Sequence, residues 1–259
     1  MSFDVTPIAC LSDNYAYAVK CTKTGALAIV DPSEVEPVAK WLGDKKLTAI
    51  WNTHHHPDHC GGNEGVAAKY HPDYVAAHAS DKGRIPGQTK ELNEGDSFKL
   101  GDLDVSILHI PGHTTGAIAF VVKSGDQTAV FTGDTLFLGG CGRLFEGTPE
   151  MMHTSLQKLA KLPKDTAVYC GHEYTQSNLK FELHVEPSNT AAKARAEKAA
   201  DLRAKNLPTV PGLLEEELAT NPFLRTDSAE IRKTLGIDAS ADGGVALGVI
   251  RKAKDGFKG

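Results

Sequence analysis

The sequence predicts an α+β protein in which helices cover β-sheets and an all-helical C-terminal domain follows. Strand-like and helix-like segments alternate over the first two-thirds of the 259 residues, and short turns with glycine join several of the strands. The pattern changes near Tyr174, because no convincing strand follows it. We therefore expect two domains, a mixed one over residues 1–173 and a helical one over residues 174–259.

Short apolar runs and helical spacing account for the elements of the first domain. Hairpins are expected over residues 15–31, 97–110 and 117–132. Single strands are expected over residues 47–52 and 167–170. Amphipathic helices are expected over residues 34–42, 63–70 and 150–162. Gly43 is the expected end of the first helix, and Asn63 is the expected cap of the second.

Helix-forming segments separated by breakers make up the second domain. Its helices are expected over residues 191–205 and 213–219 and from Asp227 or Ser228 to Gly236. Asn189 or Thr190 caps the first of these, and Pro208 and Pro211 separate it from the next.

The composition is that of a globular protein without a membrane span. Hydrophobic residues make up 41% and charged residues 24%, and the net charge of -5 argues against bulk nucleic-acid binding. No apolar stretch approaches the roughly 20 residues of a transmembrane helix, and no signal peptide is visible at the start. The 5 cysteines form no C-x-x-C pair, which is typical of reduced thiols. We expect a cytoplasmic monomer that acts on a small molecule and binds neither nucleic acid nor membrane.

A dense block of potential metal ligands follows the strand over residues 47–52. The block holds four of the 11 histidines, and its candidate ligands are His54, His56, Asp58 and His59. Imidazole and carboxylate groups suit zinc and other first-row divalent metals. In an extended segment the first two histidines share a face, Asp58 continues the alternation, and His59 can turn toward a second metal.

Three further candidates lie just past predicted strands, each with glycine immediately before it. They are His113, Asp134 and His172. Loops at strand ends are the usual place for such chemistry, and glycine allows the backbone to turn sharply beneath a metal. The seven residues together predict a site for two metal ions.

Less specific interpretations apply to the other residues of this kind. A histidine-rich tract can bind metal adventitiously, but that does not explain three more ligands after strands. His55 lies between two proposed ligands and is interpreted as structural, and Cys60 as a small buried residue. The histidines interpreted as ordinary surface or core residues are His71, His78, His109, His153 and His184.

The pattern T-H-x-H-x-D-H, followed by Gly-His, Gly-Asp and Gly-His, resembles the metallo-β-lactamase superfamily. More specific segments resemble the glyoxalase II (hydroxyacylglutathione hydrolase) family. They cover residues 13–15, 63–64, 137–143, 171–175, 178–181, 184–187 and 221–225. The resemblance extends from about residue 10 to the basic C-terminus, and the segments after Tyr174 are specific to glyoxalase II.

This resemblance implies an αββα metallo-β-lactamase sandwich that carries the metals, with a helical glutathione-binding domain. The implied ligands of one metal are His54, His56 and His113. The implied ligands of the other are Asp58, His59 and His172, with Asp134 bridging.

The resemblance also implies residues that bind the glutathione part of a substrate. They are Arg143, Phe145, Tyr174, Arg251 and Lys254. Many relatives have lysine and tyrosine at the first two positions. Arginine keeps the charge, whereas phenylalanine lacks a hydroxyl that could hydrogen-bond to glutathione.

The implied reaction is hydrolysis of the thioester S-D-lactoylglutathione to glutathione and D-lactate, the second step of methylglyoxal detoxification. Two divalent cations lower the pKa of a bridging water, so a bridging hydroxide held with Asp58 and Asp134 is the expected nucleophile. Zinc is the expected metal, and iron and manganese also tolerate this ligand set. Because a thiolate is a good leaving group, a dedicated general acid is not required.

Three other functions remain open from the sequence. Within the superfamily the chain could be a β-lactamase or a lactonase, although the missing signal peptide and the C-terminal segment weigh against both. A one-iron persulfide dioxygenase would resemble the metal domain but not the helical C-terminus. A non-enzymatic protein would bind metal without hydrolysing a thioester.

Overall fold

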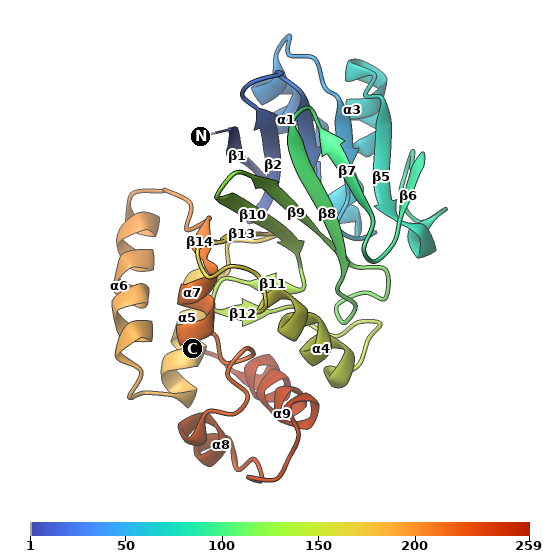
Figure 1. Cartoon of the computed structure of the whole chain (residues 1–259). Helices are drawn as coiled ribbons and strands as arrows, with labels where there is room; N and C mark the ends of the chain where they lie inside the picture. Colours follow the sequence, from blue (N-terminus) through green and yellow to red (C-terminus); the bar gives the residue numbers. More distant parts are fainter. Residues whose placement is uncertain (1) are drawn as a thin grey trace. The chain divides into compact units, whose positions relative to one another are not determined.

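The hairpin predicted over residues 15–31 lies inside a six-stranded sheet in the computed structural model, which describes residues 2–259 (Figure 1). The sheet has the order β1-β2-β3-β4-β5-β6. Its strands are β1 (Phe3–Cys10), β2 (Asn14–Cys21), β3 (Leu27–Val30), β4 (Ala49–Trp51), β5 (Tyr74–His78) and β6 (Lys90–Leu92). The pairs from β1 to β3 are antiparallel, and those from β3 to β6 are parallel.

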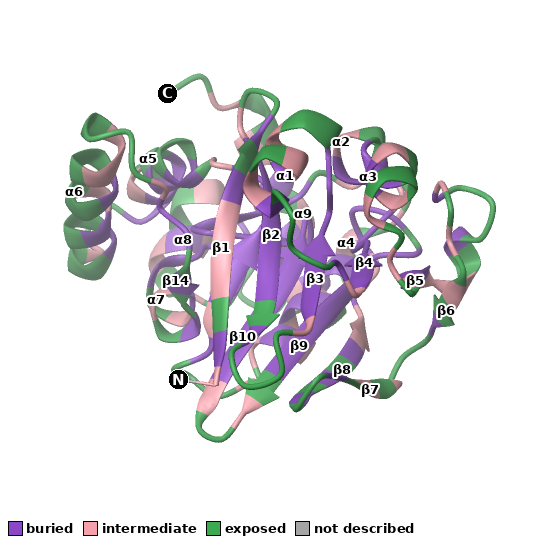
Figure 2. Cartoon of the chain, turned by 90° about the horizontal axis from the view of Figure 1, so that it is seen from above, coloured by how far each residue is buried: buried purple, intermediate pink, exposed green. Residues whose placement is uncertain are grey.

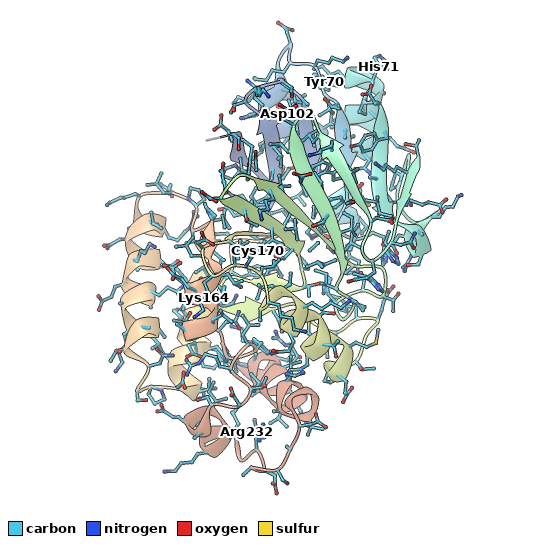
Figure 3. The ribbon with its side chains drawn as sticks, viewed as in Figure 1. Tyr70, His71, Asp102, Lys164, Cys170 and Arg232 are labelled. Atoms are coloured by element: carbon cyan, nitrogen blue, oxygen red, sulfur yellow. The ribbon has the colours of Figure 1, made fainter. Side chains whose placement is uncertain are left out.

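Two helices, α1 (Val35–Leu42) and α3 (Asn63–Tyr70), pack on one face of this sheet. Val38 and Leu42 of α1 and Val66 of α3 are buried with Ile29 and Ile50 of the strands. Full burial of each such side chain contributes about 1.5–3 kcal/mol. The hydroxyl of Tyr70, labelled in Figure 3, donates a hydrogen bond of 3.0 Å to the carbonyl of Ala39 and links the two helices.

The other face of the sheet packs on a second sheet, in which the pairs of strands between Ser97 and Gly133 are antiparallel. This six-stranded sheet runs β14-β13-β10-β9-β8-β7, with β7 (Ser97–Leu100), β8 (Leu103–His109), β9 (Ile118–Ser124), β10 (Gln127–Gly133), β13 (Ala167–Cys170) and β14 (Gly212–Leu213). Trp51 stacks on Phe120 at 5.0 Å between ring centroids, and Tyr17 lies 5.5 Å from Phe131. Figure 2 shows β2, β3 and β4 buried over most of their length, as expected for strands covered on both faces.

The chain forms two compact units, and each unit is built from several separate segments. Unit 1 holds the described part of Met1–His109 together with Gly116–Gly133 and Tyr169–His172. Unit 2 holds Ile110–Thr115, Asp134–Val168 and Glu173–Gly259. The chain passes from one unit to the other close to each of the predicted ligands His113, Asp134 and His172. Met1, the first residue of the predicted metal domain, lies outside the described residues.

Unit 2 is mainly helical. Its elements are the hairpin β11 (Leu136–Phe137) and β12 (Gly140–Cys141), the short strand β14 (Gly212–Leu213), and the helices α4 (Pro149–Leu159), α5 (Thr175–Val185), α6 (Thr190–Ala204), α7 (Leu214–Thr220), α8 (Ala229–Leu235) and α9 (Gly243–Gly256). Asn189 caps α6 by accepting a 3.0 Å hydrogen bond from the amide of Ala192. Arg232 of α8 (Figure 3) donates to the carbonyls of Asp238 and Ala241 and so holds the loop before α9. Among residues 2–259, no helix combines the length and apolar character that crossing a bilayer requires.

The predicted hairpins and most predicted helices are confirmed. The three hairpins are β2–β3, β7–β8 and β9–β10, and the helix predicted from Glu34 begins at Val35 and ends before Gly43. The helices predicted in the second domain correspond to α6, α7 and α8, each within two residues of its expected limits.

Two expectations about the type of element are wrong. The chain after Tyr174 does contain a strand, β14, which pairs with β13 through Gly212 and Val168. Two residues are too few to show any periodic pattern. Asp58 does not continue an extended segment, because Pro57 begins a single helical turn, α2 (Pro57–Cys60). The fixed φ of proline suits the first position of a helix.

Two carboxyl groups lie close together in the helical part of unit 2. Glu182 is fully buried, and the side-chain amide of Asn189 donates to Oε1 of Glu182 at 3.1 Å and to Oε2 of Glu186 at 2.7 Å. Arg225 and Ser228 also donate to Glu186. Burial, followed by the neighbouring Glu186, raises the pKa of Glu182 to about 9. Glu182 is therefore protonated in the folded protein at neutral pH.

This arrangement predicts a loss of stability at alkaline pH. Glu182 binds a proton in the folded state but loses it in the unfolded state above about pH 4.3, so stability falls as pH rises from there to about 9. Glu182→Gln, which keeps a donor at this position, should raise the Tm above pH 7 and flatten its dependence on pH. Calorimetry from pH 5 to 9 measures this, with Glu197→Gln on the exposed side of α6 as the control. An unchanged slope in Glu182→Gln would contradict the assignment.

Candidate metal centre

Three of the predicted ligands converge in unit 1. One ligand atom from each of Asp58, His59 and His172 lies within 4.8 Å of the others. Oδ2 of Asp58 is 3.7 Å from Nε2 of His59 and 3.4 Å from Nε2 of His172. Two imidazole nitrogens and a carboxylate oxygen in this arrangement match the ligands of a divalent zinc-type site.

The single helical turn of α2 places two of these ligands. His56 is still extended, with ψ 141°, and Pro57 then starts the turn. Asp58 and His59 follow within the turn, where the latter is buried. The change from extended to helical backbone separates His54 and His56 from Asp58 and His59. Strict alternation would have placed these ligands along one line.

A buried carboxylate, Asp31, fixes the orientation of His59. It directly follows β3 and accepts hydrogen bonds from the amide and hydroxyl of Thr53, at 2.8 and 2.6 Å, and from Nδ1 of His59 at 3.0 Å. Because Nδ1 carries the proton that this bond requires, Nε2 is the nitrogen that faces Asp58. Asp31, His54 and His59 also have ligand atoms within 4.8 Å of one another, but the three hydrogen bonds to Asp31 assign that carboxylate to support rather than to ligation.

The turn between β1 and β2 orients the other two ligands. Nδ1 of His172 donates to Oδ1 of Asp13 at 2.8 Å, which again leaves Nε2 toward Asp58. Nδ2 of Asn14 donates to the carbonyl and to Oδ2 of Asp58, at 3.0 and 3.1 Å. The amide of Tyr15 donates to the carbonyl of Gly171 at 2.9 Å, so the turn and the end of β13 are joined by backbone as well.

Asn52 and Asn63 form a buried amide pair beneath the block. The side-chain amide of Asn63 donates to that of Asn52 at 2.8 Å, and Asn52 donates to the carbonyl of His59 at 3.2 Å. The predicted capping role of Asn63 is wrong, since Gly62 is the N-cap of α3 and Asn63 is its first residue. The side chain points inward because its amide satisfies other buried polar groups.

His54 and His56 form a second pair of candidate ligands in unit 1. Nε2 of His54 lies 3.2 Å from Nδ1 of His56. With Zn–N bonds of about 2.0–2.1 Å and tetrahedral angles, two ligand nitrogens lie about 3.3 Å apart, so the pair fits one cation. The side chain of His55 lies next to Asp81 instead, with its Nδ1 3.8 Å from Oδ2 of that residue.

The remaining two candidates lie together in unit 2. Nε2 of His113 is 3.5 Å from Oδ2 of Asp134, and both residues are buried. Nδ1 of His113 donates to the carbonyl of Arg143 at 2.8 Å. This histidine therefore has the same arrangement as His59 and His172, with Nδ1 held by an acceptor and Nε2 beside a carboxylate.

The five predicted substrate-binding residues all belong to unit 2. Phe145 is 63% exposed, and its ring lies 5.2 Å from that of His113. Tyr174 is partly exposed beside Phe137, at 5.3 Å between rings. Arg143 is largely exposed, with Nε 3.5 Å from Oδ1 of Asp255.

Arg251 and Lys254 occupy more enclosed positions on α9. Arg251 is buried and donates to the carbonyl of Cys141 at 2.7 Å and to Asp255 at 3.1 Å. Its first role is thus to attach α9 to β12. Lys254 donates to the carbonyl of Ser177 at 2.8 Å, and burial followed by the charge of Arg251 lowers the pKa of Lys254 to about 8.

The residues that orient the ligands are not among the site residues predicted from the sequence. These are Asp13, Asn14, Asp31 and Asn52, with Asn63 assigned a different role. A signal existed for Asp31 and Asn52, because each is a polar residue directly after a buried strand. For Asp13 nothing in the sequence indicates its partner, which lies 159 residues away.

Comparison with known proteins identifies two families along the chain. A family model described as "Metallo-beta-lactamase superfamily" matches residues 13–172, and one described as "Hydroxyacylglutathione hydrolase C-terminus" matches residues 173–257. The hydroxyacylglutathione hydrolase of Rhodospirillum rubrum is 46% identical over 259 residues, covering 99% of both chains. A protein of Arabidopsis thaliana named "Hydroxyacylglutathione hydrolase cytoplasmic" is 43% identical over 258 residues, covering 97% of this chain and 98% of its own.

Solved structures show the same fold. The crystal structure of ETHE1 from Myxococcus xanthus has a TM-score of 0.66 at 23% identity and covers 99% of this chain and 100% of its own. The structure "TTHA1623 in a di-iron-bound form" has a TM-score of 0.54 at 30% identity and covers 65% of this chain and 91% of its own. The predicted metallo-β-lactamase fold with a helical C-terminal region is confirmed.

Two glycines in left-handed conformation provide a matched test of the ligand support. Gly133 ends β10 with φ +49°, and a Cβ atom there would lie 2.3 Å from Oγ1 of Thr53. Gly125, in the β9–β10 turn, has φ +57° and nothing within 4 Å of a Cβ atom. Alanine costs about 1–2 kcal/mol at either position through the backbone.

Gly133→Ala should lower the Tm more than Gly125→Ala and should also weaken metal binding, because the methyl group displaces the hydroxyl that binds Asp31. Thermal unfolding and metal content of both purified variants measure the difference. Equal effects of the two substitutions would show that contact with Thr53 is unimportant.

Proposed function

Because the chain belongs to the hydroxyacylglutathione hydrolase family of the metallo-β-lactamase superfamily, we propose that it hydrolyses S-D-lactoylglutathione to glutathione and D-lactate. The reaction is hydrolysis of a thioester, the second step of methylglyoxal detoxification. The observation that carries the proposal is the match of residues 173–257 to the C-terminal region specific to these hydrolases, in one chain with converging metal ligands. A lactamase or dioxygenase function does not account for that C-terminal match.

The proposed centre holds two divalent cations, and zinc is the proposed metal. His54, His56 and His113 would hold one cation, Asp58, His59 and His172 the other, and Asp134 would be shared. The support is chemical: each of His59, His113 and His172 has Nδ1 engaged by an acceptor, so that its Nε2 lies on the side of a carboxylate. When bound, the two cations supply an activated water and stabilise the negative charge that develops on the thioester oxygen. Iron also suits these ligands, and one related structure is described as di-iron.

The chain's own residues contribute orientation and charge balance. Asp13, Asp31 and the carbonyl of Arg143 hold the imidazoles, and Asn14 holds the carboxylate of Asp58. The negative charges of Asp58 and Asp134 would partly neutralise the positive charges of two cations. The site would keep a net positive charge, which suits an anionic transition state. The departing thiolate of glutathione needs no proton donor, so no side chain is assigned as a general acid.

Residues 1–173 are proposed to carry the metals and residues 174–259 to bind most of the glutathione part. Arg143, Phe145, Tyr174, Arg251 and Lys254 are the proposed contacts. Glutathione carries two carboxylates, and guanidinium and ammonium groups bind such groups through charge-assisted hydrogen bonds. Phe145 offers an aromatic face but no hydroxyl.

A buried polar cluster supports the segment that carries Arg143. Glu217 of α7 accepts a 2.8 Å hydrogen bond from the amide of Gly139, and Arg195 of α6 is paired with Glu217. Asn221 donates to the carbonyls of Phe137 and Gly140, at 3.2 and 3.0 Å. The family-specific helices thereby fix the β11–β12 hairpin, and this supports a role of that hairpin in binding substrate.

The cytoplasm is the proposed compartment, and a monomer with no nucleic-acid partner is the proposed state. One relative is named as cytoplasmic, and all five cysteines are free and buried, which agrees with a reducing environment.

The proposed function is tested by steady-state hydrolysis of S-D-lactoylglutathione together with metal analysis of the purified protein. We expect turnover and two metal ions per chain. Asp134→Ala should lower kcat at least 100-fold and reduce the metal content, since it removes the proposed shared ligand. Full activity of this variant with two metals bound would refute the shared role. Metal binding without any thioester hydrolysis by the unchanged protein would refute the function.

The lowered pKa of Lys254 predicts how the affinity for the substrate changes with pH. With a pKa of about 8, its ammonium group loses its charge above that pH, so KM should rise between pH 7.5 and 9 while kcat is little affected. Lys254→Ala should raise KM at least 5-fold at pH 7, and Lys254→Arg, which stays charged, should remove the rise at high pH.

Lys252→Ala, an exposed lysine on the same helix, is the control and should behave as the unchanged protein. If Lys254→Arg shows the same rise of KM with pH, the rise comes from the titration of another group. For Arg251→Ala we expect both a higher KM and a lower Tm, because this side chain is buried and attaches α9 to β12.

A further inference from the structure

A fully buried carboxylate lies outside the proposed ligand set. Asp81 ends the short helical segment η1 (Ala79–Asp81), and its exposed fraction is 0%. A buried aspartate is costly unless its charge is paired, so its position requires an explanation. None of the proposed steps of the reaction uses Asp81.

The charge of Asp81 is paired with Arg84, and both side chains lie next to His55 in unit 1. Nη2 of Arg84 contacts Oδ1 of Asp81, and Nη1 of Arg84 lies 3.4 Å from Nε2 of His55. The third side of this group is a looser contact, because Nδ1 of His55 lies 3.8 Å from Oδ2 of Asp81, which is longer than a hydrogen bond. Arginine can only donate, so Nε2 of His55 accepts and Nδ1 carries the ring proton toward the carboxylate.

The carboxylate also packs against a second segment next to a proposed ligand. A Cβ atom at Gly116 would lie 2.1 Å from Oδ1 and 2.5 Å from Cγ of Asp81. Any larger residue at this position would displace Asp81. Gly116 follows His113 by three residues, so the backbone next to this ligand segment is in contact with the same carboxylate.

We propose that Asp81 is a positioning residue for the metal ligands His54 and His56, acting through His55. His55 lies between those two ligands in sequence, and its ring lies 5.0 Å from that of His56 and contacts Arg84 and Asp81. Fixing this ring restricts the backbone dihedrals from which the imidazoles of His54 and His56 extend. The 3.2 Å separation of their ring nitrogens is then preformed, and the cation does not have to order the segment on binding. The inference rests on the proposed assignment of His54 and His56 as ligands.

A purely structural role for Asp81 would have different measurable effects from a positioning role. Pairing with Arg84 alone would stabilise the loop over residues 79–88 and would affect the folding of unit 1 without favouring one cation. A positioning role changes the affinity for the cation at His54 and His56 and leaves the one at Asp58, His59 and His172 unchanged.

The test titrates full-length, metal-depleted protein with Zn²⁺ against a chromophoric chelator and records the visible spectrum of the Co²⁺ form. Asp81→Asn should weaken binding of one of the two cations about 10- to 100-fold, the range found for residues that support metal ligands, and leave the other unchanged. Added zinc should restore kcat, and KM should change little. Asp104→Asn, an exposed carboxylate paired with Lys99 in unit 1, loses the same charge and should bind both cations normally.

His55→Asn provides the second variant, because it keeps the pair of Asp81 and Arg84. It should weaken the same cation, and the double variant should be no weaker than the stronger single one, since both act through one contact. Additive effects, or normal affinity for both cations in folded Asp81→Asn, would overturn the proposal. If Asp81→Asn does not fold, normal affinity in His55→Asn overturns it. Failure of the unchanged protein to hydrolyse the thioester would instead count against the proposed function, because the zinc titration needs no substrate.

Discussion

A histidine that binds a metal almost always donates its other ring N–H to an acceptor, and three histidines of the candidate centre meet this constraint. Nδ1 of His59, His172 and His113 is bound by Asp31, Asp13 and the carbonyl of Arg143. Each bond fixes the tautomer and the rotation of its ring together. Without these acceptors the rings would carry unsatisfied buried donors, and the three Nε2 atoms would have no fixed direction. The local backbone of the ligand segments is arranged around these bonds.

Among these acceptors, Asp31 makes the most hydrogen bonds. Its carboxylate follows β3, and it accepts from the amide and hydroxyl of Thr53, which follows β4. Neighbouring parallel strands end at the same edge of a sheet, so a side chain after one strand reaches the segment after the next. Asn52 and Asn63 complete this support by holding the carbonyl of His59. Asp81, which is also buried, lies on another segment of unit 1, with Oδ2 3.8 Å from Nδ1 of His55.

In unit 2, several buried side chains of the C-terminal region stabilise other segments. Asn221 and Glu217 hold the β11–β12 hairpin, and Asn178 donates to the carbonyl of Leu138 in its turn at 3.1 Å. Arg251 attaches α9 to the same hairpin. The more exposed groups, Arg143 and Phe145, follow the hairpin. A rigid scaffold holds such exposed side chains in place for contact with a substrate.

The amino-acid sequence by itself determined most of the element types, the positions of three hairpins and the seven candidate metal ligands. These depend on short-range properties: the period of apolar residues, glycine at turns, and polar side chains just after strands. Tertiary structure alone decided the partners of those ligands, such as Asp13 for His172, because 159 residues separate them and no local pattern encodes the pairing. It also decided that Asp58 lies in a helical turn and that Asn63 points inward, since buried hydrogen bonds outweigh a local preference for alternation or capping.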